Sequence, residues 1–492
     1  MARVAQEQGG SGQARLQTFE RNAWVRLLRP SVFGHHLHPW IFVLGLVESA
    51  ILFSAVYVAA LIRSAGDLSF IEEVESEFLG DAVAFLIAML VAMIATGLYQ
   101  TRQRVHHYGT VLRVGVALAA GTAVLTLIYY VLPDVRVWRG VAALALIYSF
   151  FMLVAIRLLF LRVVDQDLFK RRALVFGWGK RAATILELRR RSDQRGFKIV
   201  GFVGAPGEEP LVEPAKRIEL KERELLQYAR ANDIDEIVVA MDDRRQGLPS
   251  EALIECRLNG IQVCDVLDFL AREAGKVNVR LLWPSYLIFS KGFAQNPVSA
   301  ASKRALDLVA SALLFALMLP VTAFIALAIW LEDGTPILYR QKRVGLHGRQ
   351  FELYKFRSMC KDAEAASGPQ WATAKDCRIT RVGAWIRKTR ADELPQLINV
   401  LRGQMSFVGP RPERPEFVSE LVKNIPYYAE RHYVKPGITG WAQLCYPYGS
   451  SDRDALQKLQ YDLFYMKNQS LLFDLMILLQ TVEVVLWGKG SR

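Results

Sequence analysis

Four apolar stretches in the first third of the chain place the strongest constraint on its fold. They cover residues 40–62, 82–99, 114–133 and 141–161. Each is close to the length of about 20 residues that an α-helix needs to cross the hydrocarbon core of a bilayer. A helix also satisfies its own backbone hydrogen bonds, which lipid cannot do. The sequence therefore predicts a bundle of four transmembrane helices over residues 40–165, which follows a polar, cytoplasmic N-terminal arm, residues 1–39.

The charges around these stretches predict the orientation of the bundle. The arm, the segment 100–113 and the segment after residue 161 are basic, whereas the loop 63–80 is acidic. Because Lys and Arg are enriched in cytoplasmic loops, we expect both ends of the bundle in the cytoplasm. Two charges fall inside the stretches, Glu48 and Arg157. We expect a protonated or paired Glu48 that faces the bundle interior and an Arg157 that snorkels to the membrane surface.

The net charge of the chain indicates an anionic partner. The chain has 61 Lys and Arg against 48 Asp and Glu, a formal net charge of +13. Nucleic acid is one partner for such a chain, and an anionic membrane surface or a phosphate substrate is another. The apolar stretches favour membrane lipid and a phosphate substrate, so we expect no nucleic-acid partner.

Residues 166–290 have the pattern of a separate, cytoplasmic α/β domain. The strand-like segments ALVFG, KIVGFVG, EIVVAM and IQVCDV alternate with helical ones, which predicts a Rossmann-like parallel sheet. The segment from Gly177 to Ala182 reads G-x-G-x-x-A, the pattern of a dinucleotide-binding loop. No acidic residue closes the second strand to hold a ribose, so we favour a structural or regulatory module without a nucleotide, with NAD binding as the alternative. A linker is expected at residues 291–302.

A fifth apolar run, residues 308–331, contains no charged residue and is divided by Pro320. The helix before Pro320 would measure ~18 Å, which is shorter than the ~30 Å hydrocarbon core. A helix kinked at this proline can enter and leave the membrane on the same face. We therefore predict a reentrant helix over residues 308–331, and a kinked but ordinary fifth span is the alternative.

Three clusters in residues 303–492 combine Arg or Lys with Gly and Pro turns. They are YRQKRVGLHGRQFELYKFRSM (339–359), RKTRADELPQLINVLRGQMSFVGPRPERPEF (387–417) and KPGITGWAQL (435–444). Guanidinium groups on fixed turns suit phosphate oxygens, and loops that face anionic lipid are the alternative. The second cluster also contains the adjacent carboxylates Asp392 and Glu393. On its own, an Asp shortly before a Pro is typical of a helix N-cap.

Together with Lys303-Arg304, the Pro-broken helix and the segment YDLFYMKNQSLLFDLMILLQT (461–481), these clusters resemble the bacterial sugar transferase family. Its members are monotopic phosphoglycosyl transferases, or polyprenyl-phosphate hexose-1-phosphate transferases. The resemblance covers nearly all of residues 300–492, and the bundle and α/β domain resemble the large, exopolysaccharide-initiating, exosortase-associated form. It implies a mainly α (α+β) catalytic domain, residues 303–492, on the cytoplasmic face of the bacterial inner membrane.

The resemblance implies a two-step reaction. Asp392 would attack the sugar-bearing phosphate of a UDP-sugar and expel UMP. Polyprenyl (undecaprenyl) phosphate would then take the sugar phosphate from Asp392, which is the first membrane step of exopolysaccharide synthesis. A carboxylate that approaches a diphosphate needs fixed positive charge and a divalent cation, and the resemblance implies Glu393 as a ligand of Mg²⁺. We expect the helix dipole and neighbouring cations to keep Asp392 ionised.

Further residues are candidates for binding the substrates. Arg387 and Arg411 match the phosphate-contacting arginines of the family, and Arg411 lies between Pro410 and Pro412 in one turn. Lys355 and Arg357 are expected to bind either substrate phosphate or lipid phosphate. Pro436 and Gly437 are expected to shape the nucleotide pocket, and a tight structural turn is the alternative.

Two other functions compete with the transferase. A non-catalytic membrane scaffold of polysaccharide assembly has no need of Asp392 and Glu393 together with Arg387 and Arg411. A nicotinamide-dependent membrane oxidoreductase would use the Gly177–Ala182 loop and would leave the C-terminal third unexplained. The family resemblance implies UDP-glucose or UDP-galactose as donor and a homodimer.

Overall fold

The computed structural model describes most of the chain in two compact units. One unit comprises residues 1–93 and 99–166, and the other comprises residues 94–98 and 167–492. The described residues are 39–64, 69–96, 98–99, 107–131, 138–164, 170–188, 197–245, 247–290, 292–293, 297–360, 378–446, 449 and 451–486. The predicted N-terminal arm lies almost wholly outside them.

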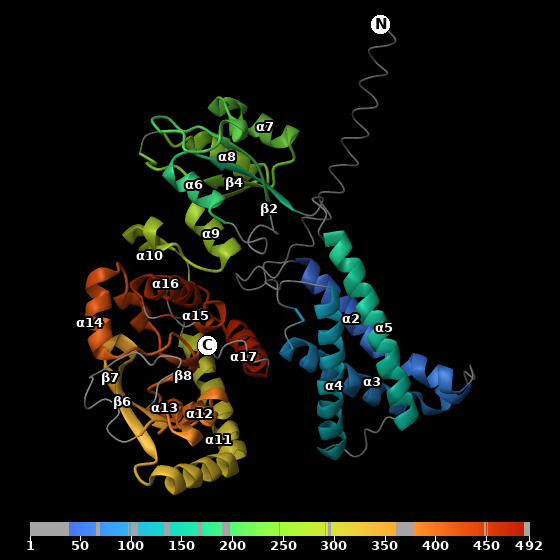
Figure 1. The fold of residues 1–492 in the computed structure, drawn as a ribbon. Helices are drawn as coiled ribbons and strands as arrows, with labels where there is room; N and C mark the ends of the chain where they lie inside the picture. The colour runs from blue at the N-terminus through green and yellow to red at the C-terminus, as the bar shows by residue number, and fades with distance from the viewer. Residues whose placement is uncertain are drawn as a thin grey trace. The chain divides into compact units, whose positions relative to one another are not determined.

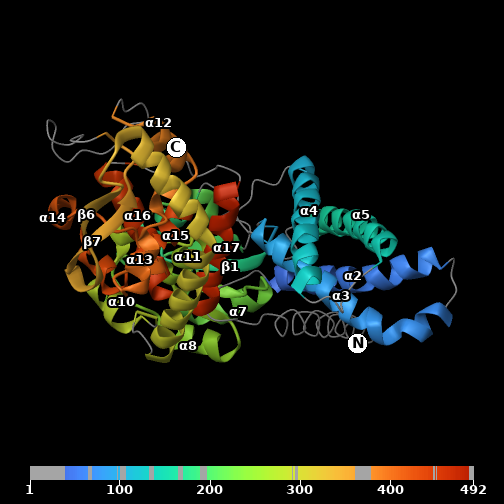
Figure 2. The ribbon, with the colours of Figure 1, turned by 90° about the horizontal axis from the view of Figure 1, so that it is seen from below.

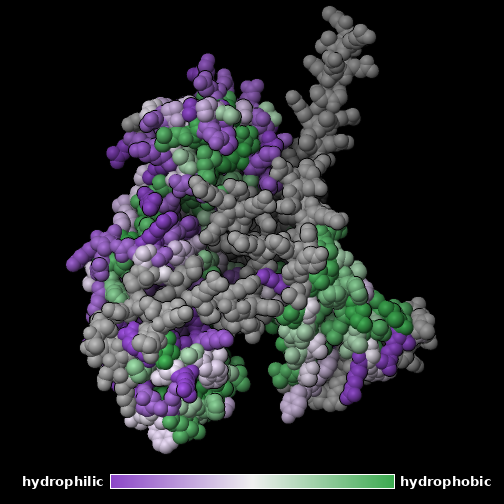
Figure 3. Space-filling view, in the orientation of Figure 1, coloured by the Kyte–Doolittle hydropathy of each residue, from purple (hydrophilic) through white to green (hydrophobic). Residues whose placement is uncertain are grey.

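The first unit is a helical bundle. Its helices are α2 (Pro39–Arg63), α3 (Ser69–Ala95), α4 (His107–Val131) and α5 (Arg139–Val164). Figure 3 shows apolar residues over much of its visible surface. Among the described residues, four helices are long and apolar enough to cross a membrane, and three of them, Val43–Arg63, Arg113–Tyr130 and Arg139–Phe160, belong to this unit.

The second predicted span corresponds to α3, whose described apolar part, Leu79–Ile94, is shorter than a span. Helix α3 begins at Ser69, so the prediction of a loop over residues 63–80 is wrong for most of that segment. The acidic residues that suggested a loop are also adequate helix formers, and they continue the hydrogen-bonded ladder of the apolar helix.

Glu48 on α2 and Arg157 on α5 are bonded to each other inside the bundle. Arg157 Nη2 donates to Glu48 Oε2 at 2.9 Å, and both side chains are buried. The Arg157 guanidinium also lies over the Tyr99 ring, 5.2 Å from its centroid. The paired Glu48 is confirmed. The snorkelling Arg157 is wrong, because the guanidinium is needed inside the bundle to offset a buried carboxylate.

The second unit begins with a five-stranded parallel sheet in the order β3-β2-β1-β4-β5. Helices cover both of its faces (Figure 1), and β1 shows why, since Ala173 and Val175 point into one core and Leu174 and Phe176 into the other. The predicted Rossmann-like domain is confirmed. Its elements are β1 (Arg171–Phe176), α6 (Lys180–Leu186), β2 (Phe197–Val203), β3 (Arg217–Ile218), α7 (Leu225–Ala231), β4 (Glu236–Val239), α8 (Ser250–Leu258), β5 (Gln262–Asp265) and α9 (Val266–Ala274).

The rest of the second unit is mainly helical, with two small pairs of strands. The cluster 339–359 folds into the antiparallel pair β6 (Leu338–Val344) and β7 (Gln350–Phe356). The parallel pair is β8 (Ser406–Val408) and β9 (Gly437–Thr439). The helices are α10 (Pro284–Phe289), α11 (Pro297–Asp333), α12 (Arg381–Lys388), α13 (Gln396–Leu401), α14 (Pro415–Asn424), α15 (Trp441–Cys445), α16 (Asp452–Lys467) and α17 (Leu471–Leu486).

Helix α11 contains Pro320 and is the fourth candidate span. It begins at Pro297, so residues 297–302 are helical and the predicted linker is wrong there. Figure 1 shows that the helix bends in its middle, and Thr322 Oγ1 donates to the Leu319 carbonyl oxygen at 2.8 Å beside the proline. Most of the apolar side chains of the candidate span are exposed: only 11% of it is buried inside the protein.

Both ends of α11 are fastened to the same domain. Near its start, Asp307 Oδ1 accepts hydrogen bonds of 3.0 Å from the Ser406 hydroxyl and from the Phe407 N–H. At its end, Arg357 Nη2 donates to the carbonyl oxygen of Asp333 at 2.9 Å. Figure 2 shows α17 beside the first half of α11. A straight helix of this length would measure ~55 Å, and the bend brings its two ends closer together than that.

Helix α9 belongs to two hydrophobic cores at once. Val266 and Phe269 pack in the core of the α/β domain, whereas Leu267 and Ala271 pack in a core with residues of α14 and α16. The backbone continues this contact, since the Trp441 indole N–H donates to the Gly275 carbonyl oxygen at 2.8 Å. The α/β domain and the C-terminal domain are therefore joined through a shared helix.

Candidate active site

The two adjacent carboxylates, Asp392 and Glu393, lie on a tight turn between α12 and α13. Arg390 has a left-handed backbone (φ 61°), and Ala391–Glu393 form one turn of 3₁₀ helix, η6. Helix α13 then starts at Gln396, with Pro395 in the capping position. The prediction that Asp392 sits at the start of a helix as its cap is wrong, because the 3₁₀ turn separates it from α13.

Glu393 is the centre of a cluster of cations. The nearest contact is a hydrogen bond of 2.9 Å from Arg411 Nη2 to Glu393 Oε1. Lys355 Nζ lies 3.4 Å and Arg390 Nη1 lies 3.8 Å from the same oxygen. Burial opposes the ionisation of Glu393, but the charges of Arg411, Lys355 and Arg390 outweigh it and hold the pKa of this carboxyl well below its usual range. Glu393 is therefore an ionised, fixed carboxylate.

Asp392 has the opposite environment. It is half-buried, and its carboxylate makes no side-chain hydrogen bond or ion pair with the part of the chain that the structure describes. Burial and the neighbouring charge of Glu393 raise the pKa of Asp392, while Lys355, Arg411 and Arg390 lower it in part. The cations thus favour the ionised form of Asp392, as expected, but they are bonded to Glu393, and the desolvation of Asp392 outweighs their charge and leaves its pKa above the ordinary value.

Arg411 is held in place by the turn that contains it. The Gly409 N–H donates to the Thr439 carbonyl oxygen, and the Gly437 N–H donates to the Pro410 carbonyl oxygen, both at 2.9 Å. These bonds extend the β8–β9 pair up to Arg411. The backbones approach closely, since a Cβ on Gly437 would lie 2.1 Å from the Gly409 nitrogen. For Gly437 the structure therefore favours the structural alternative over the lining of a nucleotide pocket.

A buried ion pair between Arg431 and Asp462 stabilises the turn that contains Arg411. Arg431 Nη2 lies 2.8 Å from Asp462 Oδ2 and donates to the Arg411 carbonyl oxygen at 3.0 Å. Arg431 Nη1 donates to the Tyr428 hydroxyl at 2.6 Å. Arg431 and Asp462 are both buried, so breaking the pair would leave an uncompensated charge inside the protein. Neither residue was among those predicted from the sequence.

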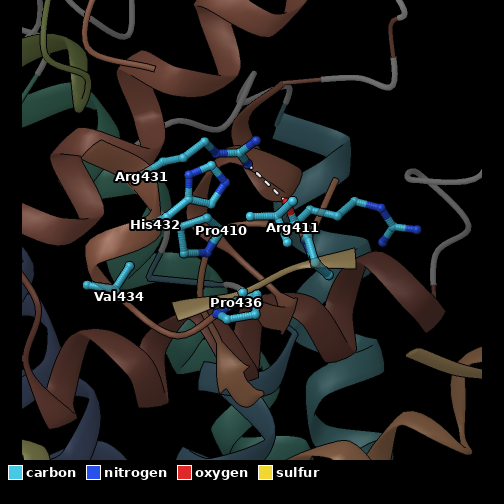
Figure 4. Close-up of a pocket in the computed structure, with 9 residues that line it drawn as sticks. Pro410, Arg411, Arg431, His432, Val434 and Pro436 are labelled. Carbon is cyan, nitrogen blue, oxygen red and sulfur yellow. Dashed lines mark hydrogen bonds between the residues drawn. The ribbon is translucent and has the colours of Figure 1, made fainter. Parts of the chain in front are cut away.

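A small hollow lies beside this turn. Figure 4 shows Arg431 reaching towards the Arg411 backbone, with His432, Pro410 and Pro436 next to it. Burial and the neighbouring Arg431 lower the pKa of His432 to about 4, so the ring is neutral at pH 7. The hollow is lined by Val344, Gly345, Pro410, Arg411, Pro412, Arg431, His432, Val434 and Pro436. The predicted Pro410, Pro412 and Pro436 thus lie together around Arg411.

Comparison with known proteins identifies the family of the chain. The family model described as bacterial sugar transferase matches residues 298–488. The chain is 31% identical over 335 residues to the UDP-glucose:undecaprenyl-phosphate glucose-1-phosphate transferase of Xanthomonas campestris pv. campestris, across 65% of this chain and 68% of that relative. The chain belongs to the bacterial sugar transferase family.

Two further relatives name different sugars. The chain is 45% identical over 264 residues to a UDP-glucose:undecaprenyl-phosphate glucose-1-phosphate transferase of Caulobacter vibrioides, across 49% of this chain and 97% of the relative. It is 39% identical over 251 residues to the UDP-N-acetylgalactosamine-undecaprenyl-phosphate N-acetylgalactosaminephosphotransferase of Aeromonas hydrophila. That match spans 51% of this chain and 58% of the relative. A second family model, described as a CoA-binding domain, matches residues 94–259.

The structure brings most, but not all, of the predicted residues of this sugar transferase together. Asp392, Glu393, Lys355 and Arg411 form one cluster, as described above. Arg387 lies in the last turn of α12, and no contact between the described residues joins it to either carboxylate. Arg390 makes that contact instead, and its signal in the sequence is its position three residues before Glu393.

Arg357 contacts the end of α11 and not the two carboxylates. Its Nη2 atom donates to the carbonyl oxygens of Asp333 and Gly334, each at 2.9 Å, and lies 3.0 Å from Asp333 Oδ2. The side chain is buried. Arg357 thus attaches the end of α11 to the rest of the domain. Its buried side chain is not in an exposed position suited to binding lipid phosphate.

Proposed function

We propose that this protein transfers a hexose 1-phosphate from a UDP-sugar to undecaprenyl phosphate, with Asp392 as the nucleophile. The observation that carries this proposal is the division of roles between the two carboxylates. Glu393 is bonded to cations, whereas Asp392, in the same cluster, has no partner among the described residues. The names of the relatives, which include UDP-sugars and undecaprenyl phosphate, support the same substrates.

In the first step, an oxygen of Asp392 attacks the sugar-bearing phosphorus of the UDP-sugar. A phosphorus–oxygen bond to Asp392 forms, and the bond to the bridging oxygen breaks, so UMP leaves with that oxygen. Burial raises the pKa of Asp392, which makes its ionised form more basic and a stronger nucleophile. The guanidinium of Arg411 and the ammonium of Lys355 lie where they can offset the negative charge of the diphosphate.

In the second step, a phosphate oxygen of undecaprenyl phosphate attacks the same phosphorus. The bond to Asp392 breaks, its carboxylate is regenerated, and undecaprenyl-diphospho-sugar is released. This product is the lipid-linked starting unit for exopolysaccharide assembly. The exosortase-associated subgroup stays a prediction, and so does the homodimer, which light scattering of the purified protein would test.

The residues at the site fit the expected Mg²⁺. Every ion pair that Glu393 makes with the described residues uses Oε1, which leaves Oε2 for a cation, and Asp392 adds a second hard oxygen donor. Mg²⁺ is commonly held by one or two carboxylates together with substrate phosphates. When bound, the ion would supply positive charge to the diphosphate and to the leaving UMP.

The proposed location is the cytoplasmic side of the inner membrane, with α11 as a reentrant helix. The exposed apolar side chains of α11 and the attachment of both its ends to one domain support this arrangement. In a cysteine-free background, Lys423→Cys, at an exposed position, should react with an impermeant maleimide in inside-out vesicles. Reaction in right-side-out vesicles only would contradict the proposed location.

The reaction is tested by UMP release from purified wild type in nanodiscs, with Mg²⁺, undecaprenyl phosphate and a panel of UDP-sugars. The panel contains UDP-glucose, UDP-galactose and UDP-N-acetylgalactosamine. We expect release with at least one sugar by wild type and none by Asp392→Asn, whose change of one oxygen to nitrogen keeps the shape of the side chain. Glu416→Gln, at an exposed carboxylate on α14, is the control. Equal release by Asp392→Asn and wild type would exclude Asp392 as the nucleophile, and no release by wild type with any sugar would favour the scaffold.

A further inference from the structure

The α/β domain contains a loop whose sequence is typical of nucleotide binding. It follows β1 and reads Gly177-Trp178-Gly179-Lys180-Arg181-Ala182, and the matching family model is described as a CoA-binding domain. In folds that bind nucleotides here, the backbone N–H groups at the start of the following helix donate to the phosphates. The contacts of these N–H groups therefore decide whether the loop can bind such a ligand.

Two carboxylates of the domain already accept hydrogen bonds from these N–H groups. Glu208 Oε2 accepts from the N–H of Trp178 at 2.9 Å and of Gly179 at 3.2 Å. The two oxygens of Asp242 accept from the N–H of Lys180 at 2.9 Å and of Arg181 at 2.8 Å. Four consecutive donors of the loop are therefore satisfied by the protein itself.

The second glycine of the loop shows how closely Asp242 approaches. In dinucleotide-binding folds this glycine lets the backbone come close to the pyrophosphate. Here, a Cβ on Gly179 would lie 2.2 Å from Asp242 Oδ2. The Asp242 N–H in turn donates to Glu208 Oε1 at 2.6 Å, which links the two carboxylates into one network. The space that the glycine provides is thus taken up by a side chain of the same domain.

The neighbouring ribose position is covered as well. A dinucleotide-binding fold has an acidic residue near the end of its second strand to bind the ribose. In this protein the Trp178 ring lies against Gly204, just after β2, since a Cβ there would be 2.4 Å from Trp178 Cη2. The indole N–H donates to the Glu208 carbonyl oxygen at 3.2 Å, which holds the ring in place.

We propose that Glu208 and Asp242 occupy the phosphate position of this loop, so that the α/β domain binds neither CoA nor a dinucleotide. Two fixed carboxylates repel a diphosphate, and a ligand would have to break four hydrogen bonds to displace them. The domain instead acts as a brace for the C-terminal domain. Helix α9 carries this role, because it packs at once in the α/β core and against α14 and α16.

Hydrogen–deuterium exchange of the full chain in nanodiscs tests the proposal, because it reports on the loop itself and not on the active site. We compare peptides that cover residues 177–186 in wild type, with and without millimolar CoA or NAD, and in the double variant Glu208→Gln, Asp242→Asn. We expect no change on adding either ligand to wild type. In the double variant we expect exchange in the loop to be roughly tenfold faster, because charge-assisted hydrogen bonds to the loop N–H groups are weakened.

The controls separate a local effect from unfolding. Glu209→Gln changes an exposed neighbouring carboxylate and should leave the loop as slow as in wild type. Peptides from β4 should stay protected in all variants, and if the double variant unfolds, Glu208→Gln alone is compared. Protection of the loop by CoA or NAD in wild type would overturn the proposal, and so would a loop that exchanges as slowly in the folded double variant as in wild type.

Discussion

Arg411 and Glu393 are joined by a hydrogen bond of 2.9 Å although 18 residues separate them in the sequence. Arg411 belongs to the turn after β8, and Glu393 belongs to the 3₁₀ turn before α13. The bond fixes a guanidinium beside the proposed nucleophile, and a second contact of 3.4 Å to Gln443 Oε1 adds to its orientation. The position of Arg411 therefore depends on its planar guanidinium, which donates to two partners in different directions, and not on its charge alone.

Arg411→Lys keeps the charge and should still lower UMP release by about 100-fold, as expected when one donor to a reacting phosphate is lost. An ammonium group cannot contact Glu393 and Gln443 with the spacing of a guanidinium. The initial rate of UMP release with saturating UDP-sugar measures the effect. Arg349→Lys, at an exposed position on the β6–β7 hairpin, is the control. A rate within a factor of about two of wild type would show that charge alone is sufficient.

The pH dependence of the reaction should report Asp392. Burial and the charge of Glu393 raise its pKa, and the nucleophile must be ionised, so activity should fall as the pH drops through this raised value. The charge of Lys355 lowers the pKa of Asp392. Lys355→Met should therefore move the acid limb of kcat/KM to higher pH, besides lowering the rate. An acid limb that stays in place, or moves to lower pH, would contradict the assignment of this limb to Asp392.

Gly437→Ala should destabilise the C-terminal domain and reduce activity. Its Cβ would lie 2.1 Å from the Gly409 nitrogen, so β8 and β9 must separate, and the Arg411 turn moves with them. We expect a loss of about 1–3 kcal/mol, typical of overpacking, measured as a lower unfolding midpoint in denaturant. Gly80→Ala, where no atom lies within 4 Å of the added Cβ, is the matched control. Unchanged stability and activity in Gly437→Ala would show that the strand pair can absorb a methyl group.

His432 should make the folded state less stable in acid. Its pKa is about 4 in the folded protein, against an ordinary value of 6.5. Between these values the unfolded chain binds more protons than the folded one, so stability falls as the pH drops from 6.5 to 4. His432→Gln should remove about 1–3 kcal/mol of this loss. Thermal unfolding of both proteins across this pH range measures it, and parallel curves would exclude His432 as a source.

Pro320→Ala should allow α11 to straighten. The proline removes one backbone hydrogen bond and its ring crowds the preceding turn, and a straight α11 of ~55 Å would move its two ends apart. In the vesicle assay, Lys423→Cys should then become reactive from the opposite face of the membrane in part of the molecules, with loss of activity in proportion. If the variant is labelled in the same way as the Lys423→Cys protein that keeps Pro320, tertiary contacts alone maintain the bend.

The sequence predicts those parts of this protein that depend on local patterns. The strands of the α/β domain are examples, because short apolar runs that are rich in β-branched residues and bounded by Gly and polar residues favour buried strands. Asp392, Glu393 and Arg411 were also predicted, because residues 387–417, one of the clusters that resemble the family, contain all three. The apolar run around Pro320 was correctly assigned to one element, although its helix starts earlier, at Pro297.

Features that depend on contacts between distant segments could not be predicted. The pKa of Asp392 is set by how deeply the turn is buried and by which carboxylate binds the cations, and neither is visible in the sequence RADELPQ. Arg390 was not predicted as a site residue: its spacing to Glu393 is visible in the sequence, but its left-handed backbone and the tight turn that follows are not. The Arg431–Asp462 pair joins η7 (Ala429–Tyr433) to α16, and nothing in either segment alone indicates its partner.

The shared helix α9 changes where this protein can be divided. The family model for the transferase begins at residue 298, which suggests a catalytic fragment that starts there. Such a fragment would lose α9 and α10 and would expose to water the residues they cover: Leu421, Ile425, Tyr428, Leu459 and Leu463. Tyr428 also binds Arg431, so the damage would reach the support of Arg411. We therefore expect a stable transferase fragment of this chain to include α9, so that the residues of this shared core stay covered.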